Sequence, residues 1–235
     1  MYTIFHVLYL VMNIPVLFFG LLTQLLHNDN YYVYQYYNWS LRTLYESFFT
    51  LEIINEDHYN AVFDKQRYLY VMNHQTYDAY LVTLSTQKVS CCIRSWSIYI
   101  PVIGQLWYLL DFVFIKNGKD TVRSIIHKLS SANSLSLAIF PEGTRNSDCI
   151  FRPDKVKSGA FIIAKELNLP LMPFYHTLGE CINDTTKTIH FGKKIKIMVG
   201  KPIYPANKTI EEIKHEFCSQ IIELEKLVKR HDLCE

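Results

Sequence analysis

A histidine and an aspartate stand close together directly after a short apolar stretch. The stretch ends at Met72, and His74 and Asp78 follow within the segment Asn-His-Gln-Thr-Tyr-Asp. Neutral imidazole accepts protons near pH 7, and a carboxylate on its second ring nitrogen fixes the tautomer and stabilises the imidazolium. No Ser or Cys nearby has a nucleophile-elbow context. The pair therefore favours a general base that activates a substrate hydroxyl. The alternative is a histidine with only a structural role in a turn.

A second polar segment follows another apolar stretch, at Phe-Pro-Glu-Gly-Thr-Arg, residues 140–145. Pro141 and Gly143 predict a turn, since Gly tolerates positive φ. From a fixed turn, Arg145 can hold a phosphate with two parallel hydrogen bonds. Further basic residues follow at positions 152, 155 and 157. The alternative for a single Arg in a turn is a solvated charge.

Both segments lie where predicted strands end. Short apolar runs predict strands at 68–72, 89–93, 112–116, 135–140 and 170–174, and a possible hairpin of 188–191 with 194–199 around Gly192. Helical patterns cover 77–86, 100–110, 120–131, 158–167 and 209–229. Strand–helix alternation predicts an α/β fold, a central mixed sheet flanked by helices. Active residues of such sheets gather where strands end and helices begin.

The N-terminal segment predicts attachment to a membrane. Residues 3–26 carry no Asp, Glu, Lys or Arg, and 24 residues suffice to cross a hydrocarbon core of roughly 30 Å. The Tyr-rich run 31–39 is typical of an aromatic interface belt. No basic residue precedes the apolar run, which disfavours a signal peptide, and the basic residues downstream favour a cytosolic location for the rest. A buried helical hairpin of a soluble protein is the alternative.

Composition narrows the function classes. With 235 residues, 49% hydrophobic, the chain can bury a large core. A net charge of +2 is too small to indicate nucleic-acid binding. The six cysteines show no metal-ligand spacing, so we expect reduced thiols and no metal.

The chain resembles the glycerolipid acyltransferase family, which includes 1-acylglycerol-3-phosphate and lysophospholipid acyltransferases. The resemblance covers roughly residues 65–205 and rests on four blocks in the family's order, followed by Gly-Lys-Pro-Ile at 200–203. The blocks are Asn-His-Gln-Thr with Asp78; Ile-Pro-Val-Ile-Gly at 100–104, running on to Phe-Ile-Lys at 114–116; Phe-Pro-Glu-Gly-Thr-Arg at 140–145; and Leu-Pro-Leu-Met-Pro at 169–173.

The resemblance implies attack of a lysophospholipid hydroxyl on the thioester of acyl-CoA. His74 would take the hydroxyl proton and Asp78 would orient His74. Glu142, Gly143, Thr144 and Arg145, with Lys116, would bind the phosphate-bearing acceptor. Acyl-CoA is then a co-substrate, and no cofactor, metal or nucleic acid is expected. We expect a membrane-anchoring segment at 1–60 and an acyltransferase domain at 61–235, which faces the cytosol from a membrane such as the endoplasmic reticulum of a eukaryote.

The chain departs from the family pattern in the spacing of its first block. Relatives have four residues between the His and the Asp, and here there are three. An i, i+4 pair on a helix differs in direction by about 40°, whereas an i, i+5 pair differs by about 140°. Contact therefore remains possible, but a catalytically silent lipid-binding homologue stays open, as does a remodelling enzyme or transacylase for another head group. Lys116 stands where relatives often carry Arg, and its alternative is a solvated strand end.

Overall fold

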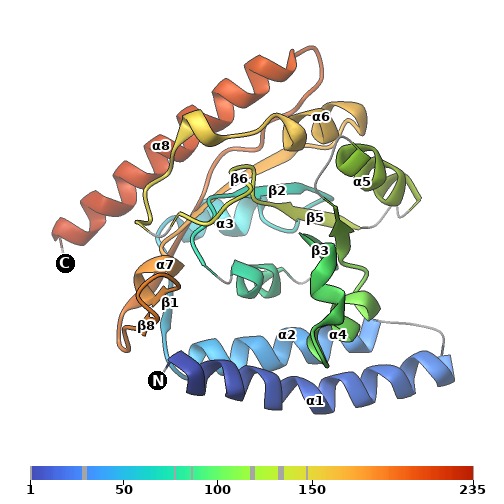
Figure 1. Cartoon of the computed structure of the whole chain (residues 1–235). Helices are drawn as coiled ribbons and strands as arrows, with labels where there is room; N and C mark the ends of the chain where they lie inside the picture. Colours follow the sequence, from blue (N-terminus) through green and yellow to red (C-terminus); the bar gives the residue numbers. More distant parts are fainter. Residues whose placement is uncertain are drawn as a thin grey trace.

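The computed structural model describes residues 2–27, 31–76, 78–85, 87–116, 120–131, 135–146 and 148–234. Two long helices, α1 (Tyr2–His27) and α2 (Tyr31–Glu46), precede the first strand. Tyr77 and Thr86, the two ends of the expected helix 77–86, lie outside the described residues, as does Asn117, which follows Lys116. Figure 1 shows three layers, with a sheet between these two helices and a second group of helices.

A mixed sheet of seven strands forms the centre, in the order β1-β9-β6-β2-β5-β3-β4. Neighbouring strands run parallel except for the antiparallel pair β6 and β9. The predicted α/β fold with a mixed sheet is therefore confirmed. The strands are β1 (Thr50–Ile53), β2 (Leu69–Met72), β3 (Val89–Arg94), β4 (Val113–Ile115), β5 (Ser136–Ile139), β6 (Leu171–His176) and β9 (Lys194–Val199).

Helices and short elements connect these strands. The α-helices are α3 (Glu56–Val62), α4 (Ile103–Leu109), α5 (Asp120–Ser131), α6 (Gly159–Glu166), α7 (Leu178–Cys181) and α8 (Ile210–Cys234). The 3-10 helices are η1 (Asp78–Leu84), η2 (Ser95–Tyr99) and η3 (Pro153–Lys155). A separate two-stranded sheet pairs β7 (Ile182–Asn183) with β8 (Thr188–Ile189).

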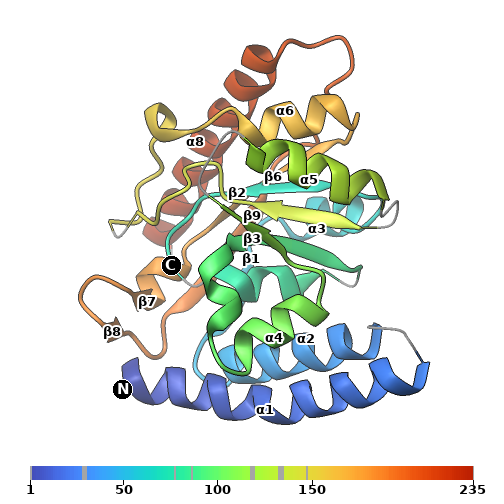
Figure 2. The same cartoon turned by 45° about the vertical axis from the view of Figure 1, so that its right-hand side comes forward.

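Alternation along the central strands builds two hydrophobic cores, one on each face of the sheet. In β2, Tyr70 and Met72 join the core shared with α1 and α2. Leu69 and Val71 join the core shared with α5, α6 and α8. Successive strand side chains point to opposite faces, so a strand buried on both sides reads as a continuous apolar run. Figure 2 shows the same two helical layers on either side of the sheet.

One local prediction is wrong. The segments 188–191 and 194–199 do not form a hairpin: β8 pairs with β7, whereas β9 lies between β6 and β1. Ile195, Ile197 and Val199 are buried, which a strand with neighbours on both sides achieves and an isolated hairpin does not. The expected helix 77–86 is present as the shorter 3-10 helix η1.

The aromatic run 31–39 is part of α2. Tyr34 and Tyr37 are buried in the core, while Tyr32, Tyr36 and Trp39 are exposed. The run has a helical period because one face of α2 packs against the sheet. The N-terminal helices thus share a core with residues beyond 61, and β1 is the sheet's edge strand beside β9.

Candidate active site

His74 and Asp78 meet at the carboxyl end of β2. Nδ1 of His74 lies 2.6 Å from Oδ2 of Asp78. An ionised carboxylate only accepts hydrogen bonds, so Nδ1 carries the proton and Nε2 keeps its lone pair. The imidazole stacks on Phe140, with ring centroids 4.4 Å apart, and its side chain is 19% exposed. The ring is therefore fixed in orientation and still reachable from solvent.

The short spacing works because Asp78 begins a 3-10 helix after a tight turn. Its side chain folds back over the turn and accepts hydrogen bonds from the main-chain N–H groups of Gln75 and Thr76, each at 3.0 Å. Burial alone would raise the pKa of Asp78, but the neighbouring His176 and His74 and the Thr76 amide hold it below its usual value. The carboxylate is thus ionised at neutral pH.

Glu142 follows the neighbouring strand β5 and holds the loop of residues 73–76 that carries His74, called the histidine loop below. The side chain is 2% exposed; Oε1 accepts the His74 N–H at 3.1 Å, and the other oxygen accepts from the Asn146 carboxamide. Asn146 also donates its main-chain N–H to the His74 carbonyl at 2.8 Å. Burial raises the pKa of Glu142 to about 7. We expected this carboxylate to contact the acceptor, and the structure instead uses both oxygens inside the protein.

The rest of the Glu-Gly-Thr-Arg turn faces solvent. Gly143 has φ of +67°, a backbone conformation that favours glycine, and the end of the Lys157 side chain packs beside it. Thr144 and Arg145 are exposed. Arg145 donates to Asp184 at 2.9 Å, and Asp184 also accepts from the Tyr2 hydroxyl at 2.8 Å. The turn thus offers a cation at the surface, already paired with a carboxylate.

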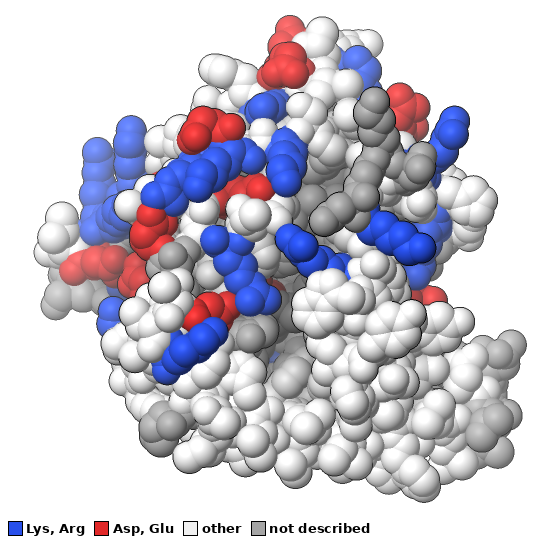
Figure 3. Space-filling model, viewed as in Figure 1, with Lys and Arg blue, Asp and Glu red and all other residues white. Residues whose placement is uncertain are grey.

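Lys116 is exposed just after β4, at the far end of the sheet from β1. β3 and β5 separate β4 from the His74 strand, so the structure does not place Lys116 in the hydrogen-bond network of His74 and Glu142. The face seen in Figure 3 nevertheless gathers Lys and Arg side chains around a hollow. The layer below them, formed by α1 and α2, is almost free of charged side chains on that face.

Sequence reasoning missed two residues that hold the histidine loop. Gln75 accepts the Gly179 N–H at 2.9 Å and donates to the Cys149 carbonyl at 3.3 Å. His176 is fully buried and hydrogen-bonded to Asn73. No local pattern signals these contacts, because the partners lie about a hundred residues apart and meet only through the pairing of β2 with β6.

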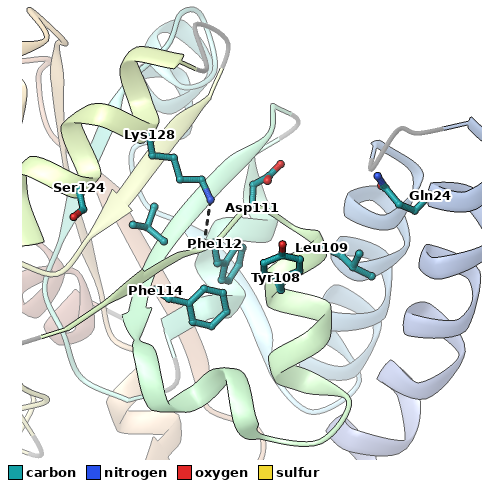
Figure 4. Close-up of a pocket in the computed structure, with 9 residues that line it drawn as sticks. Gln24, Tyr108, Leu109, Asp111, Phe112, Phe114, Ser124 and Lys128 are labelled. Atoms are coloured by element: carbon teal, nitrogen blue, oxygen red, sulfur yellow. Dashed lines mark hydrogen bonds between the residues drawn. The ribbon is translucent and has the colours of Figure 1, made fainter.

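A cavity of about 640 Å³ opens elsewhere, between α4, β4 and α5 (Figure 4). Lys128 donates to the Phe112 carbonyl at 3.3 Å beside it, and Tyr108 and Phe114 supply aromatic walls. Neither His74 nor Asp78 is among the described residues that line it. Phe114, from the segment that resembles the family's second block, therefore borders this cavity.

Comparison with known proteins now decides the family. The model of the Acyltransferase family matches residues 50–177, more than half of the chain and all of the histidine and Glu-Gly-Thr-Arg segments. The chain belongs to the Acyltransferase family. This acyltransferase-family chain also shares its fold with the crystal structure of the 1-acyl-sn-glycerophosphate acyltransferase PlsC from Thermotoga maritima. The TM-score is 0.71, over 96% of this chain and 98% of that one, at 18% sequence identity.

Curated relatives carry related names. A 1-acyl-sn-glycerol-3-phosphate acyltransferase of Haemophilus influenzae is 30% identical over 114 residues, 46% of this chain and 46% of that protein. The protein of the same name from Limnanthes alba is 32% identical over 124 residues, 48% of this chain and 42% of that protein. The acyltransferase-family chain thus spans about half the length of the curated relatives it matches.

Proposed function

We propose that this chain transfers an acyl group from acyl-CoA to the free hydroxyl of a lysophospholipid, with 1-acyl-sn-glycerol-3-phosphate as the acceptor and phosphatidate as the product. The observation that carries the proposal is the 2.6 Å hydrogen bond between His74 and Asp78. A silent homologue would be expected to have lost this contact, and the shortened spacing retains it. The names of the relatives support the choice of acceptor.

The chemistry follows from the tautomer of His74. Nε2 accepts the proton of the acceptor hydroxyl as its oxygen attacks the thioester carbonyl, and Asp78 stabilises the imidazolium that forms. The tetrahedral intermediate then collapses, the C–S bond breaks, and the imidazolium returns the proton to the departing CoA thiolate. The reaction needs no covalent enzyme intermediate. His74 would act as base in the first step and as acid in the second.

Arg145 is the proposed contact for the acceptor phosphate, together with Gly143 and Thr144. The Arg145 side chain is 43% exposed and that of its partner Asp184 is 13% exposed, so a phosphate can approach the open side of this pair. Fork-shaped hydrogen bonding from Arg suits a phosphate monoester better than a zwitterionic head group. Lys116 lies further along the sheet edge and would contribute long-range attraction rather than contact.

We also propose that α1 and α2 attach the protein to one leaflet of a membrane. Helix α1 is long and apolar enough to cross a membrane, yet Phe5, Asn13 and Val16 are buried against the protein. The opposite face exposes apolar side chains with a helical period: Ile4, Val7, Val11, Ile14 and Phe18. A helix packed along its length favours lying half-inserted, with the catalytic face toward the cytosol, over spanning.

The test is acyl transfer by the full chain in phospholipid vesicles. Radiolabelled acyl-CoA is supplied with lysophosphatidate, lysophosphatidylcholine or lysophosphatidylethanolamine. We expect product with lysophosphatidate from the wild type and from His215→Ala, an exposed histidine of α8, and none above background from His74→Ala. Product only with another acceptor would identify a remodelling enzyme. No product from folded, vesicle-bound protein with any acceptor would support the silent homologue instead.

A further inference from the structure

A second histidine lies next to the candidate pair without reaching solvent. His176 ends β6 and is 0% exposed. Its Nδ1 accepts the Leu178 N–H at 3.3 Å, so the proton sits on Nε2, which donates to the Asn73 carbonyl at 2.8 Å. Burial lowers the pKa of His176, in agreement with a neutral ring whose two nitrogens are both used. The residue therefore acts on its neighbours as a neutral hydrogen-bond donor.

Three hydrogen bonds join His176 to Asn73, the residue before His74. Besides the ring bond, the Asn73 carboxamide donates to the His176 carbonyl at 3.0 Å and accepts the His176 N–H at 3.1 Å. Together, the three hydrogen bonds use the carboxamide nitrogen, the carboxamide oxygen and the main-chain carbonyl of Asn73. The direction in which the chain leaves β2, and hence the position of the His74 Cα, is thus set by the end of β6.

The same imidazole also faces the candidate carboxylate. Nε2 of His176 lies 3.8 Å from Oδ1 of Asp78, too far for a hydrogen bond but within the range of an N–H dipole. Oδ1 accepts the Thr76 N–H, while Oδ2 accepts from His74 and Gln75. The dipole favours the ionised carboxylate at Oδ1, whereas His74 binds Oδ2. Asp78 therefore has two imidazoles as neighbours, one partly exposed and one buried.

We propose that His176 is a positioning residue for acyl transfer. Its Nε2–H fixes Asn73 and faces Asp78, and so holds the His74 ring with Nε2 unprotonated and turned to the substrate. This inference rests on the proposed function, and it adds a role for a residue outside the four blocks that carry the family resemblance. His176 does not touch substrate, so its loss alters the turnover step rather than substrate binding.

A matched pair of variants separates positioning from mere packing. His176→Gln puts an amide N–H near the place of Nε2 and keeps the bond to Asn73. His176→Asn keeps an acceptor near the place of Nδ1 but has no donor to reach Asn73. We expect kcat to fall roughly ten- to a hundredfold in His176→Asn, with little change in KM for either substrate, and to recover largely in His176→Gln. Thermal unfolding gives the folded fraction of each.

A second readout is independent of activity. Nitrogen-15 NMR of the His74 imidazole reports which ring nitrogen carries the proton. The wild type and His176→Gln should show the Nδ1–H tautomer, and His176→Asn a mixture. A wild type without acyl transfer would refute the proposed function, and the NMR comparison would still decide the positioning role.

The proposal is overturned if His176→Asn keeps the wild-type tautomer and kcat, or if both variants lose activity only in proportion to their folded fraction. If His176→Asn does not fold, Asn73→Ala serves as the second variant. It removes the two hydrogen bonds between the Asn73 carboxamide and the His176 main chain and leaves the side chains of His74, Asp78 and His176 unchanged. A lower kcat at constant KM would then support the proposal, and an unchanged kcat would refute it.

Discussion

Asp78 draws its hydrogen-bond donors from within four residues of itself. One is the His74 ring, and the others are the main-chain N–H groups of Gln75 and Thr76. Because the acceptor side chain and its donors belong to one turn, the pair does not depend on a regular helix. At this scale the spacing of three residues is accommodated because the helix starts at Asp78 itself.

Replacement of Asp78 by Asn tests the tautomer directly. The carboxamide can donate to His74 Nδ1, which moves the ring proton to Nε2 and removes the base. We expect Asp78→Asn to lower kcat by roughly 10³–10⁴-fold with the protein still folded. Steady-state kinetics in vesicles measure this, with Asp57→Asn on the exposed start of α3 as the control. Wild-type activity in Asp78→Asn would remove Asp78 from the mechanism.

Glu142 makes stability depend on pH. Its folded-state pKa of about 7 exceeds the ordinary value of 4.5, so the folded protein binds the proton more tightly than the unfolded chain does. This contribution is fully present below about pH 4.5 and is lost as pH rises through about 7, a change of roughly 3 kcal/mol at most. Glu142→Gln should abolish it and so flatten the fall in stability between these values.

The measurement is thermal unfolding against pH for the wild type, Glu142→Gln and Glu223→Gln, the last an exposed site on α8. The difference between the first two curves isolates Glu142 from the other titrating groups. Parallel curves for wild type and Glu142→Gln would show that Glu142 is ionised over the whole range.

At the scale of elements, one face of α1 packs against the protein and the opposite face is exposed. Phe18 is 66% exposed and Val16 is 5% exposed, although only about half a helical turn separates them. We expect Phe18→Asp to weaken binding to phospholipid vesicles by on the order of tenfold without changing Tm, because only the lipid-facing apolar area is lost. Val16→Asp should lower Tm instead, since it buries a charge in the core.

Vesicle co-sedimentation and thermal unfolding of the two variants give both quantities. Equal vesicle binding by Phe18→Asp and wild type would argue against the leaflet attachment proposed for this face of α1.

At the scale of the whole molecule, the N-terminal helices and the sheet share one hydrophobic core. Trp107 of α4 donates to the Tyr37 hydroxyl at 3.1 Å, and the Tyr34 hydroxyl donates to the Gln87 carbonyl at 2.6 Å. β1 also supplies the neighbour of β9. The expected boundary at residue 60 thus runs through a single hydrophobic core.

A chain of residues 61–235 should therefore fail to fold. It lacks β1 and the helices that cover Tyr70 and Met72, and so exposes one face of the sheet to water. We expect strong binding of a hydrophobic dye and no cooperative thermal transition, whereas the full chain unfolds in one step. A sharp transition of the shortened chain would show that the N-terminal segment is an independent appendage.

The sequence alone determined the elements and the chemistry that depend on near neighbours. Apolar runs located six strands of the central sheet to within about two residues, and the polar segments behind two of them marked the site, because strand and turn preferences act over a few residues. The His74–Asp78 pair belongs to this class, since one turn contains both side chains and the groups that hold them.

Only the tertiary structure decided which strands are neighbours, and with that the surroundings of the pair. β9 lies between β6 and β1, Glu142 reaches across from β5, and His176 arrives from β6. Sheet order is set by burial of both faces across the whole chain, which no local pattern encodes. The residues that hold His74 in place therefore became visible only when strands about a hundred positions apart were paired.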